Sequence, residues 1–146
     1  PPPSPRPCAA PPGCARALRA DGGLGAKGAA ALGFAMPGRA ILLGSDVPAL
    51  DADMLVASVF ALASHDAVIV PAEDGGYALF GCRGQVPDCF GAIRWSTASV
   101  LDETRTRLDA TGLSWTALPP AWDVDTADDL LRLASAARPF ASITGL

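Results

Sequence analysis

The sequence contains little charge. Asp, Glu, Lys and Arg make up 18% of its 146 residues, and Lys27 is the only lysine. Soluble domains average about 25% charged residues. Fifteen acidic against eleven basic residues give a formal net charge of -4, so the chain lacks the Lys/Arg stripe that neutralises a phosphate backbone. Nucleic acid is therefore not an expected partner.

Long apolar runs are also missing. The longest, such as 40–44 and 67–70, are far shorter than the ~20 residues that a membrane-spanning helix needs. The first residues include prolines where a secretory signal requires a continuous apolar segment. We therefore expect a soluble, cytoplasmic protein without a membrane span.

Metal-binding and nucleophilic motifs built on cysteine or histidine are not recognisable. The four cysteines are Cys8, Cys14, Cys82 and Cys89. Their spacing fits neither the Cys-x-x-Cys pairs of zinc sites nor a redox pair, so we interpret them as free thiols. The single histidine, His65, follows a predicted helix. Ser45 and Ser96 have no histidine beside them, which argues against acyl transfer.

Proline is concentrated at the start of the chain, where seven of the fourteen prolines lie within the first twelve residues. Proline fixes φ and removes a backbone donor, so residues 1–14 are expected to be a poorly ordered tail. The remainder has an ordinary composition. Because domains average roughly 100–200 residues, residues 15–146 are expected to form one domain.

Hydrophobic periodicity predicts alternating strands and helices. Short apolar runs between turn residues are typical of buried strands, and apolar residues three or four apart are typical of helices. The expected strands are 40–43, 67–70, 77–82 and 114–118. The expected helices are 24–36, 52–64, one that begins at Ser96 or Thr97 and is capped by Gly112, and one that begins near 126. This order predicts an α/β fold, a three-layer α/β/α sandwich with a mostly parallel sheet.

Asp46 is the most informative residue, because a carboxylate follows a buried strand directly. In open α/β sheets, ligands bind beyond the carboxyl ends of the strands. Oxygen ligands are what Mg²⁺ and Mn²⁺ prefer, and such ions are often held by one or two carboxylates together with substrate phosphates. Alternatively, Asp46 only caps the turn before Pro48.

Two further acidic segments are candidates. Asp123 and Asp125 lie on one side of an extended segment, where one of them completes a cation site with Asp46 or both only complement the dipole of the next helix. Glu73 and Asp74 precede the Gly-Gly-Tyr sequence of 75–77. This pattern is also typical of a tight hairpin connection.

Four segments together resemble a known family. GSDVP at 44–48, PAEDGGY at 71–77, IRWST at 93–97 and DVDT at 123–126 with DDL at 128–130 are similar, in order and spacing, to the DUF2064 family of bacterial GT-A-fold glycosyltransferases. Some members of that family are assigned to arsenosugar biosynthesis. The resemblance covers about 24–137. It implies a nucleotide-diphospho-sugar transferase fold, a nucleotide-sugar donor, a small-molecule acceptor and a Mg²⁺ or Mn²⁺ ion.

The resemblance also implies roles for individual residues. Asp46 and Asp125 would hold the metal, and Asp74 or Asp123 would accept the proton of the acceptor hydroxyl. The implied substrate-binding residues are Ser45, Pro48, Glu73, Gly75, Gly76, Tyr77 and Trp95. Trp95 either stacks on a sugar ring or anchors the core.

The chain departs from the family pattern before Leu24. Family members begin with a buried strand and a basic turn that holds the nucleotide phosphates, whereas here these positions offer only Arg6, Arg16 and Arg19. We therefore expect a domain N-terminally truncated relative to the family. The explanations left open are a truncated reading frame, a partner that supplies the missing part and a degenerate protein. A sheet without its first strand has an uncovered edge, which favours a homo-oligomer.

Two other functions are consistent with the pattern. A nucleotidyltransferase that makes an activated sugar or cofactor shares the same fold, but this class generally needs the basic N-terminal loop. A non-catalytic relative that acts as a binding or scaffold protein is favoured by the loss of the first strand. The presence of both proposed metal ligands, Asp46 and Asp125, argues against this second alternative.

Overall fold

The computed structural model describes residues 21–124 and 126–136. Within these ranges, helices and strands follow one another in the order α1 (Leu24–Gly33), β1 (Arg39–Leu43), α2 (Ala52–Ser64), β2 (Ala67–Pro71), β3 (Tyr77–Arg83), α3 (Val100–Thr111), β4 (Trp115–Ala117) and α4 (Ala127–Ala136). Each corresponds to a predicted element. The expected tail, 1–14, lies outside the described residues, as do Cys8 and Cys14, whereas Cys82 and Cys89 are buried free thiols.

The boundaries of the helices follow from local chemistry. Asp51 caps α2 by accepting a hydrogen bond of 2.8 Å from the backbone N of Met54, as its side-chain type favours. Gly112 ends α3 in the left-handed conformation, with φ of 70°. The start of α3 differs from the prediction. Ser96 has φ of 61°, which is incompatible with a right-handed helix, so α3 begins only at Val100.

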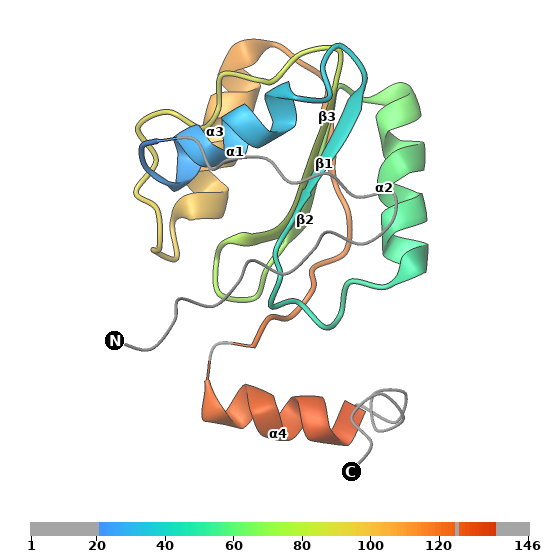
Figure 1. The fold of residues 1–146 in the computed structure, drawn as a ribbon, viewed down its shortest axis with the longest axis vertical. Helices are drawn as coiled ribbons and strands as arrows, with labels where there is room; N and C mark the ends of the chain where they lie inside the picture. The colour runs from blue at the N-terminus through green and yellow to red at the C-terminus, as the bar shows by residue number, and fades with distance from the viewer. Residues whose placement is uncertain (1–20, 125, 137–146) are drawn as a thin grey trace, which may run out of the picture.

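The sheet lies between two layers of helices. Figure 1 shows α1 and α3 on one face and α2 on the other, as predicted. Successive residues of β2 point to opposite faces: Ile69 belongs to the cluster under α1 and α3, with Phe80 and Leu108. Val68 packs in the cluster under α2, with Leu62. Both faces of the sheet are thus buried.

The expectation of a mostly parallel sheet was wrong. The strand order is β1-β3-β2-β4; β3 is antiparallel to both β1 and β2, and only β2 and β4 pair in parallel. The cause is the short connection 72–76, because two strands joined by a tight turn must run in opposite directions. All five residues of β2 are buried, so its apolar pattern could not distinguish a parallel from an antiparallel neighbour.

This topology brings three connections to one edge of the sheet. Strands β1, β2 and β4 run in the same direction, so their carboxyl ends meet the amino end of β3. Ala72 and Ala121 form a parallel bridge beyond β2. The backbone N of Val124 donates to the carbonyl O of Asp46 at 3.0 Å, which joins the segment after β4 to the segment after β1.

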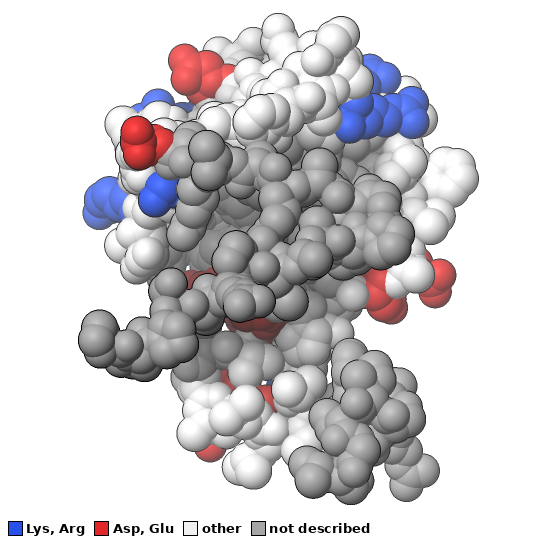
Figure 2. Space-filling view, in the orientation of Figure 1, with Lys and Arg blue, Asp and Glu red and all other residues white. Residues whose placement is uncertain are grey.

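The face of the molecule seen in Figure 2 carries its charges in small groups. On the face shown in Figure 2, the visible Lys and Arg side chains lie in separate groups near the margin, with acidic side chains among them. Of the helices in 21–124 and 126–136, none has the length and apolar character needed to cross a membrane.

Candidate functional site

A cavity of about 780 Å³ opens at this edge of the sheet. Its walls come from α1, the carboxyl end of β1, the connection 72–76, the start of β3, the segment 90–98 and the segment after β4. Three carboxylates line it, those of Asp46, Asp74 and Asp123. The fold therefore brings together acidic residues that are widely separated in the sequence.

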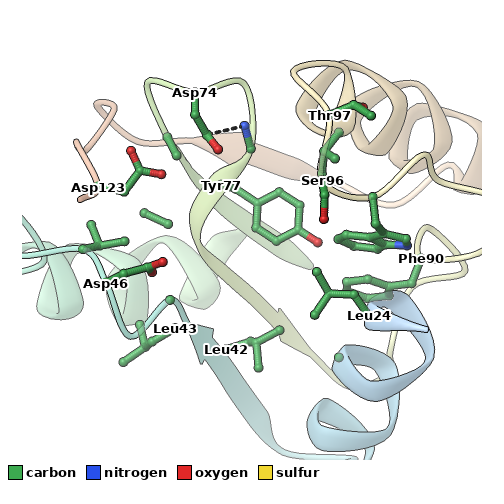
Figure 3. A pocket seen from close by; sticks show the side chains of 18 of the residues that line it. Leu24, Leu42, Leu43, Asp46, Asp74, Tyr77, Phe90, Ser96, Thr97 and Asp123 are labelled. Atoms are coloured by element: carbon green, nitrogen blue, oxygen red, sulfur yellow. Dashed lines mark hydrogen bonds between the residues drawn. The ribbon is translucent and has the colours of Figure 1, made fainter. Parts of the chain in front are cut away.

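Asp46 and Asp123 form the acidic side of the cavity. Figure 3 shows them on the same side, opposite Leu24 and Phe90. The backbone hydrogen bond from Val124 to Asp46 fixes the segments that carry Asp46 and Asp123 relative to each other. In the part of the chain that the structure describes, no three His, Cys, Asp or Glu side chains cluster as a metal site. Asp125 lies outside the described residues.

Asp74 is oriented by its own turn. Its Oδ1 accepts a hydrogen bond of 2.7 Å from the backbone N of Gly76, drawn in Figure 3. Gly75 has φ of +91°, and a Cβ there would lie 2.3 Å from the carbonyl O of Ala98. The carbonyl of Gly75 also accepts from the backbone N of Leu101 at 2.9 Å. The turn is thus packed against the segment that leads into α3.

The cavity includes some of the predicted site residues and not others. It is lined by Asp46, Asp74, Gly76, Tyr77, Trp95 and Asp123, whereas Ser45, Pro48, Glu73 and Gly75 do not line it. Glu73 instead pairs with Arg132 of α4 at 2.8 Å. The hydrogen bond from Arg132 lowers the pKa of Glu73 below its ordinary value. The guanidinium of Arg132 also lies 4.5 Å from the ring centre of Trp122.

The opposite side of the cavity is aromatic and carries a cation. The rings of Phe90 and Trp95 are nearly parallel, 9° apart in orientation, with centroids separated by 6.5 Å. Helix α1 approaches them closely because Gly25 has no side chain: a Cβ there would lie 2.8 Å from the Trp95 ring. This approach brings Leu24 and Lys27 to the cavity wall.

Tyr77 lies between the two sides (Figure 3). Its ring meets that of Trp95 edge to face, with centroids 6.3 Å apart. Burial raises the pKa of Tyr77 above its ordinary value. The phenol therefore stays protonated near neutral pH, where it can donate a hydrogen bond but cannot act as a base.

Sequence reasoning missed Lys27, Ser96 and Thr97, which all line the cavity. A signal for Lys27 was present, because it is the only lysine and lies among glycines. The signal for Ser96 was its position in the IRWST segment. Neither residue type by itself indicates which way the side chain points, because that depends on the packing of α1 and on the backbone of the segment 94–99.

Glu103 holds the segment 94–99 in place. It accepts hydrogen bonds from the backbone N of Arg94 at 2.9 Å, from Nε of Arg94 at 2.7 Å and from Oγ of Ser99 at 2.9 Å. These donors, led by the backbone N of Arg94, lower the pKa of Glu103 from 4.5 to about 2. The carboxylate on α3 thus stabilises the loop that carries Trp95 and Ser96.

We predict that Glu103→Gln reduces the loss of stability in acid. A carboxyl whose pKa is depressed on folding stabilises the protein fully above its unfolded pKa, and this contribution is lost as the pH falls towards its folded pKa. For Glu103 that window runs from about 4.5 down to about 2. Urea unfolding of both proteins at several pH values measures the difference. Identical pH dependence would show that Glu103 makes no such contribution.

Comparison with known proteins shows the family. Residues 4–97 match the family described as "Uncharacterized protein conserved in bacteria (DUF2064)", and the chain belongs to this family. No curated protein matches the sequence. The fold is similar to the crystal structure of a "putative nucleotide-diphospho-sugar transferase" from Desulfovibrio desulfuricans G20, with a TM-score of 0.74 and 32% identity. That match covers 84% of this chain and 56% of the Desulfovibrio chain, so this chain spans little more than half the length of its relative.

Proposed function

We propose that the chain belongs to a glycosyltransferase that moves a sugar from a nucleoside-diphosphate sugar to a small acceptor with the help of a divalent cation. The observation that carries the proposal is the cavity at the carboxyl ends of β1, β2 and β4, with two carboxylates on one side and Lys27 in its wall. The similarity to the Desulfovibrio protein, named as a nucleotide-diphospho-sugar transferase, supports the choice of substrate.

The acidic side has the donor set of a magnesium or manganese site. We propose Asp46 and Asp125 as the ligands of the ion. Asp46 lines the cavity, and its neighbour across the acidic side is Asp123, two residues before Asp125. One or two carboxylates completed by substrate phosphates are typical of Mg²⁺ sites. When bound, the ion would stabilise the charge of the leaving diphosphate.

Asp74 is our proposed proton acceptor. Its Oδ1 accepts a hydrogen bond from the backbone N of Gly76, and this interaction orients the carboxylate. A carboxylate held in this way can take the proton of an acceptor hydroxyl as the new glycosidic bond forms. Asp123 is the alternative acceptor; it lies on the same side of the cavity as Asp46, the proposed metal ligand.

We predict that Lys27→Met weakens the binding of nucleoside diphosphates by about 10- to 100-fold, because hydrogen bonds to charged groups contribute about 1.5–3 kcal/mol. Among the residues that the structure describes, Lys27 is the only basic one in the cavity wall, so in our proposal it contacts the diphosphate. Lys27→Arg should retain part of the affinity. Isothermal titration with UDP, GDP, ADP and dTDP in the presence of Mn²⁺ measures the effect.

A control for this substitution is Arg39→Met, which removes an exposed cation at the start of β1, outside the cavity wall. It should bind nucleotides like the unmodified protein. If Lys27→Met also binds normally, Lys27 does not contact the diphosphate. If both variants lose affinity equally, the effect is one of overall charge rather than of a local contact.

The proposed function is tested by thermal shift with UDP, GDP, ADP and dTDP sugars and with the corresponding nucleoside triphosphates, each with and without Mn²⁺. A ligand that binds only the folded state raises the melting temperature by mass action. We expect a shift that needs both the ion and one of the diphosphate sugars. A shift with a nucleoside triphosphate alone would instead indicate nucleotidyl transfer. A folded sample that responds to none of these ligands would contradict the proposal.

A further inference from the structure

Ser96 has a backbone conformation that its own contacts do not explain. Its φ is 61°, in the left-handed region that few residues other than glycine adopt. Among the described residues its hydroxyl forms no hydrogen bond, although the neighbouring Thr97 hydroxyl donates to the carbonyl of Arg94 at 2.7 Å. Glycine would satisfy the backbone at this position better. Such conformations persist where the surroundings enforce them, and they are concentrated at functional sites.

The residues on either side enforce this conformation. Arg94 is bound by Glu103 through both its backbone N and its side chain. The half-buried Trp95 ring packs against the Gly25 backbone, Phe90 and Tyr77. Because both neighbours are anchored, the backbone at Ser96 has little freedom to relax. The direction in which its side chain leaves the backbone is therefore fixed.

That direction is into the cavity. Figure 3 shows the Ser96 hydroxyl directed towards the cavity, which Ser96 and Tyr77 both line. The Tyr77 hydroxyl interacts with Thr104, which is buried, so the Ser96 hydroxyl is the group here that can still donate or accept a hydrogen bond, and it lies beside the rings of Tyr77 and Trp95. Such a combination suits a sugar, which presents several hydroxyls and an apolar ring face.

We infer that Ser96 is a specificity-determining residue that hydrogen-bonds a hydroxyl group of the donor sugar. The inference rests on the proposed function, because it assigns the sugar of the nucleotide sugar to the region between Tyr77 and Ser96. The inference also gives the left-handed backbone at Ser96 a role, which is to present this hydroxyl to the sugar. Removing the hydroxyl should therefore weaken the recognition of the sugar and leave the recognition of the nucleotide unchanged.

The test compares the unmodified protein with Ser96→Gly and Ser96→Ala. Titrations use UDP, GDP, ADP and dTDP, and the sugars of each, with Mn²⁺ present. Both variants should bind the diphosphate sugar about 3- to 10-fold more weakly, the equivalent of one neutral hydrogen bond, and bind the free diphosphate normally. Ser96→Gly should also melt at a higher temperature than Ser96→Ala, because glycine tolerates the positive φ.

Ala92→Gly is the matched control, because Ala92 also has a positive φ, 49°, and does not line the cavity. It should be at least as stable as the unmodified protein and bind the sugars normally. Unchanged sugar affinity in both Ser96 variants overturns the inference while the proposed function stands. Equal losses for the sugar and the free diphosphate also overturn it. If the unmodified protein binds no diphosphate sugar, the proposed function fails, and the inference with it.

Discussion

Replacing Asp46 by asparagine should abolish the Mn²⁺-dependent part of nucleotide binding while leaving the fold intact. Asp46 is exposed, and the hydrogen bond that joins it to Val124 is accepted by its backbone carbonyl, which the substitution retains. Asparagine keeps the size of the side chain and removes the charge. A cation interaction of several kcal/mol corresponds to a loss of about 10²-fold or more in affinity or rate.

Calorimetric titration of a nucleoside diphosphate with and without Mn²⁺ measures this loss, and the melting temperature reports on the fold. The control is Asp53→Asn, which removes the same charge from an exposed position in the first turn of α2. It should bind normally. If Asp46→Asn keeps the full metal dependence, Asp46 is not a ligand of the ion, and the proposed site loses the residue on which it depends most.

The second large effect concerns stability and arises at the turn that orients Asp74. Gly75→Ala should lower the free energy of unfolding by about 2–4 kcal/mol, since it adds backbone strain to a steric overlap. The new Cβ would lie 2.3 Å from the carbonyl O of Ala98 and 2.8 Å from its Cα. These are backbone atoms, which cannot turn aside as a flexible side chain can. Chemical denaturation measures the change.

Gly84→Ala separates the cost of backbone strain from the cost of steric overlap. Gly84 also has a positive φ, +73°, but a Cβ there meets nothing within 4 Å. This variant should therefore show only the conformational cost, about 1 kcal/mol. Equal losses in the two variants would show that the close approach of Gly75 to Ala98 contributes nothing. A smaller loss for Gly75→Ala than for Gly84→Ala would contradict the packing of the turn against the segment before α3.

The helices and strands could be predicted because their signals are local. The limits of α2 follow from the Asp51 cap and the apolar spacing that ends at Ser64, and β1 and β2 follow from short apolar runs. The four motifs that indicated the family are also local signals, because the residues within each motif follow one another in the sequence. The matched range, 4–97, confirms the family.

Several features of the candidate site could not be predicted from sequence. Glu73 and Asp74 are adjacent acids in one turn, yet Glu73 pairs with Arg132 of α4 while Asp74 lines the cavity. Lys27 reaches the wall only because Gly25 lets α1 approach Trp95. Each of these outcomes depends on a residue far away in the chain, so no local pattern encodes it.

The sequence by itself determined which segments are helical or extended, where charge is scarce and which family the chain belongs to, because these depend on residue type, spacing and contiguous motifs. Only the tertiary structure decided that β3 inserts between β1 and β2 in the reverse direction and that Asp46, Asp74 and Asp123 line one cavity. The physical reason is that strand direction and side-chain convergence depend on contacts between distant segments. A buried strand has the same apolar pattern whichever way its neighbours run.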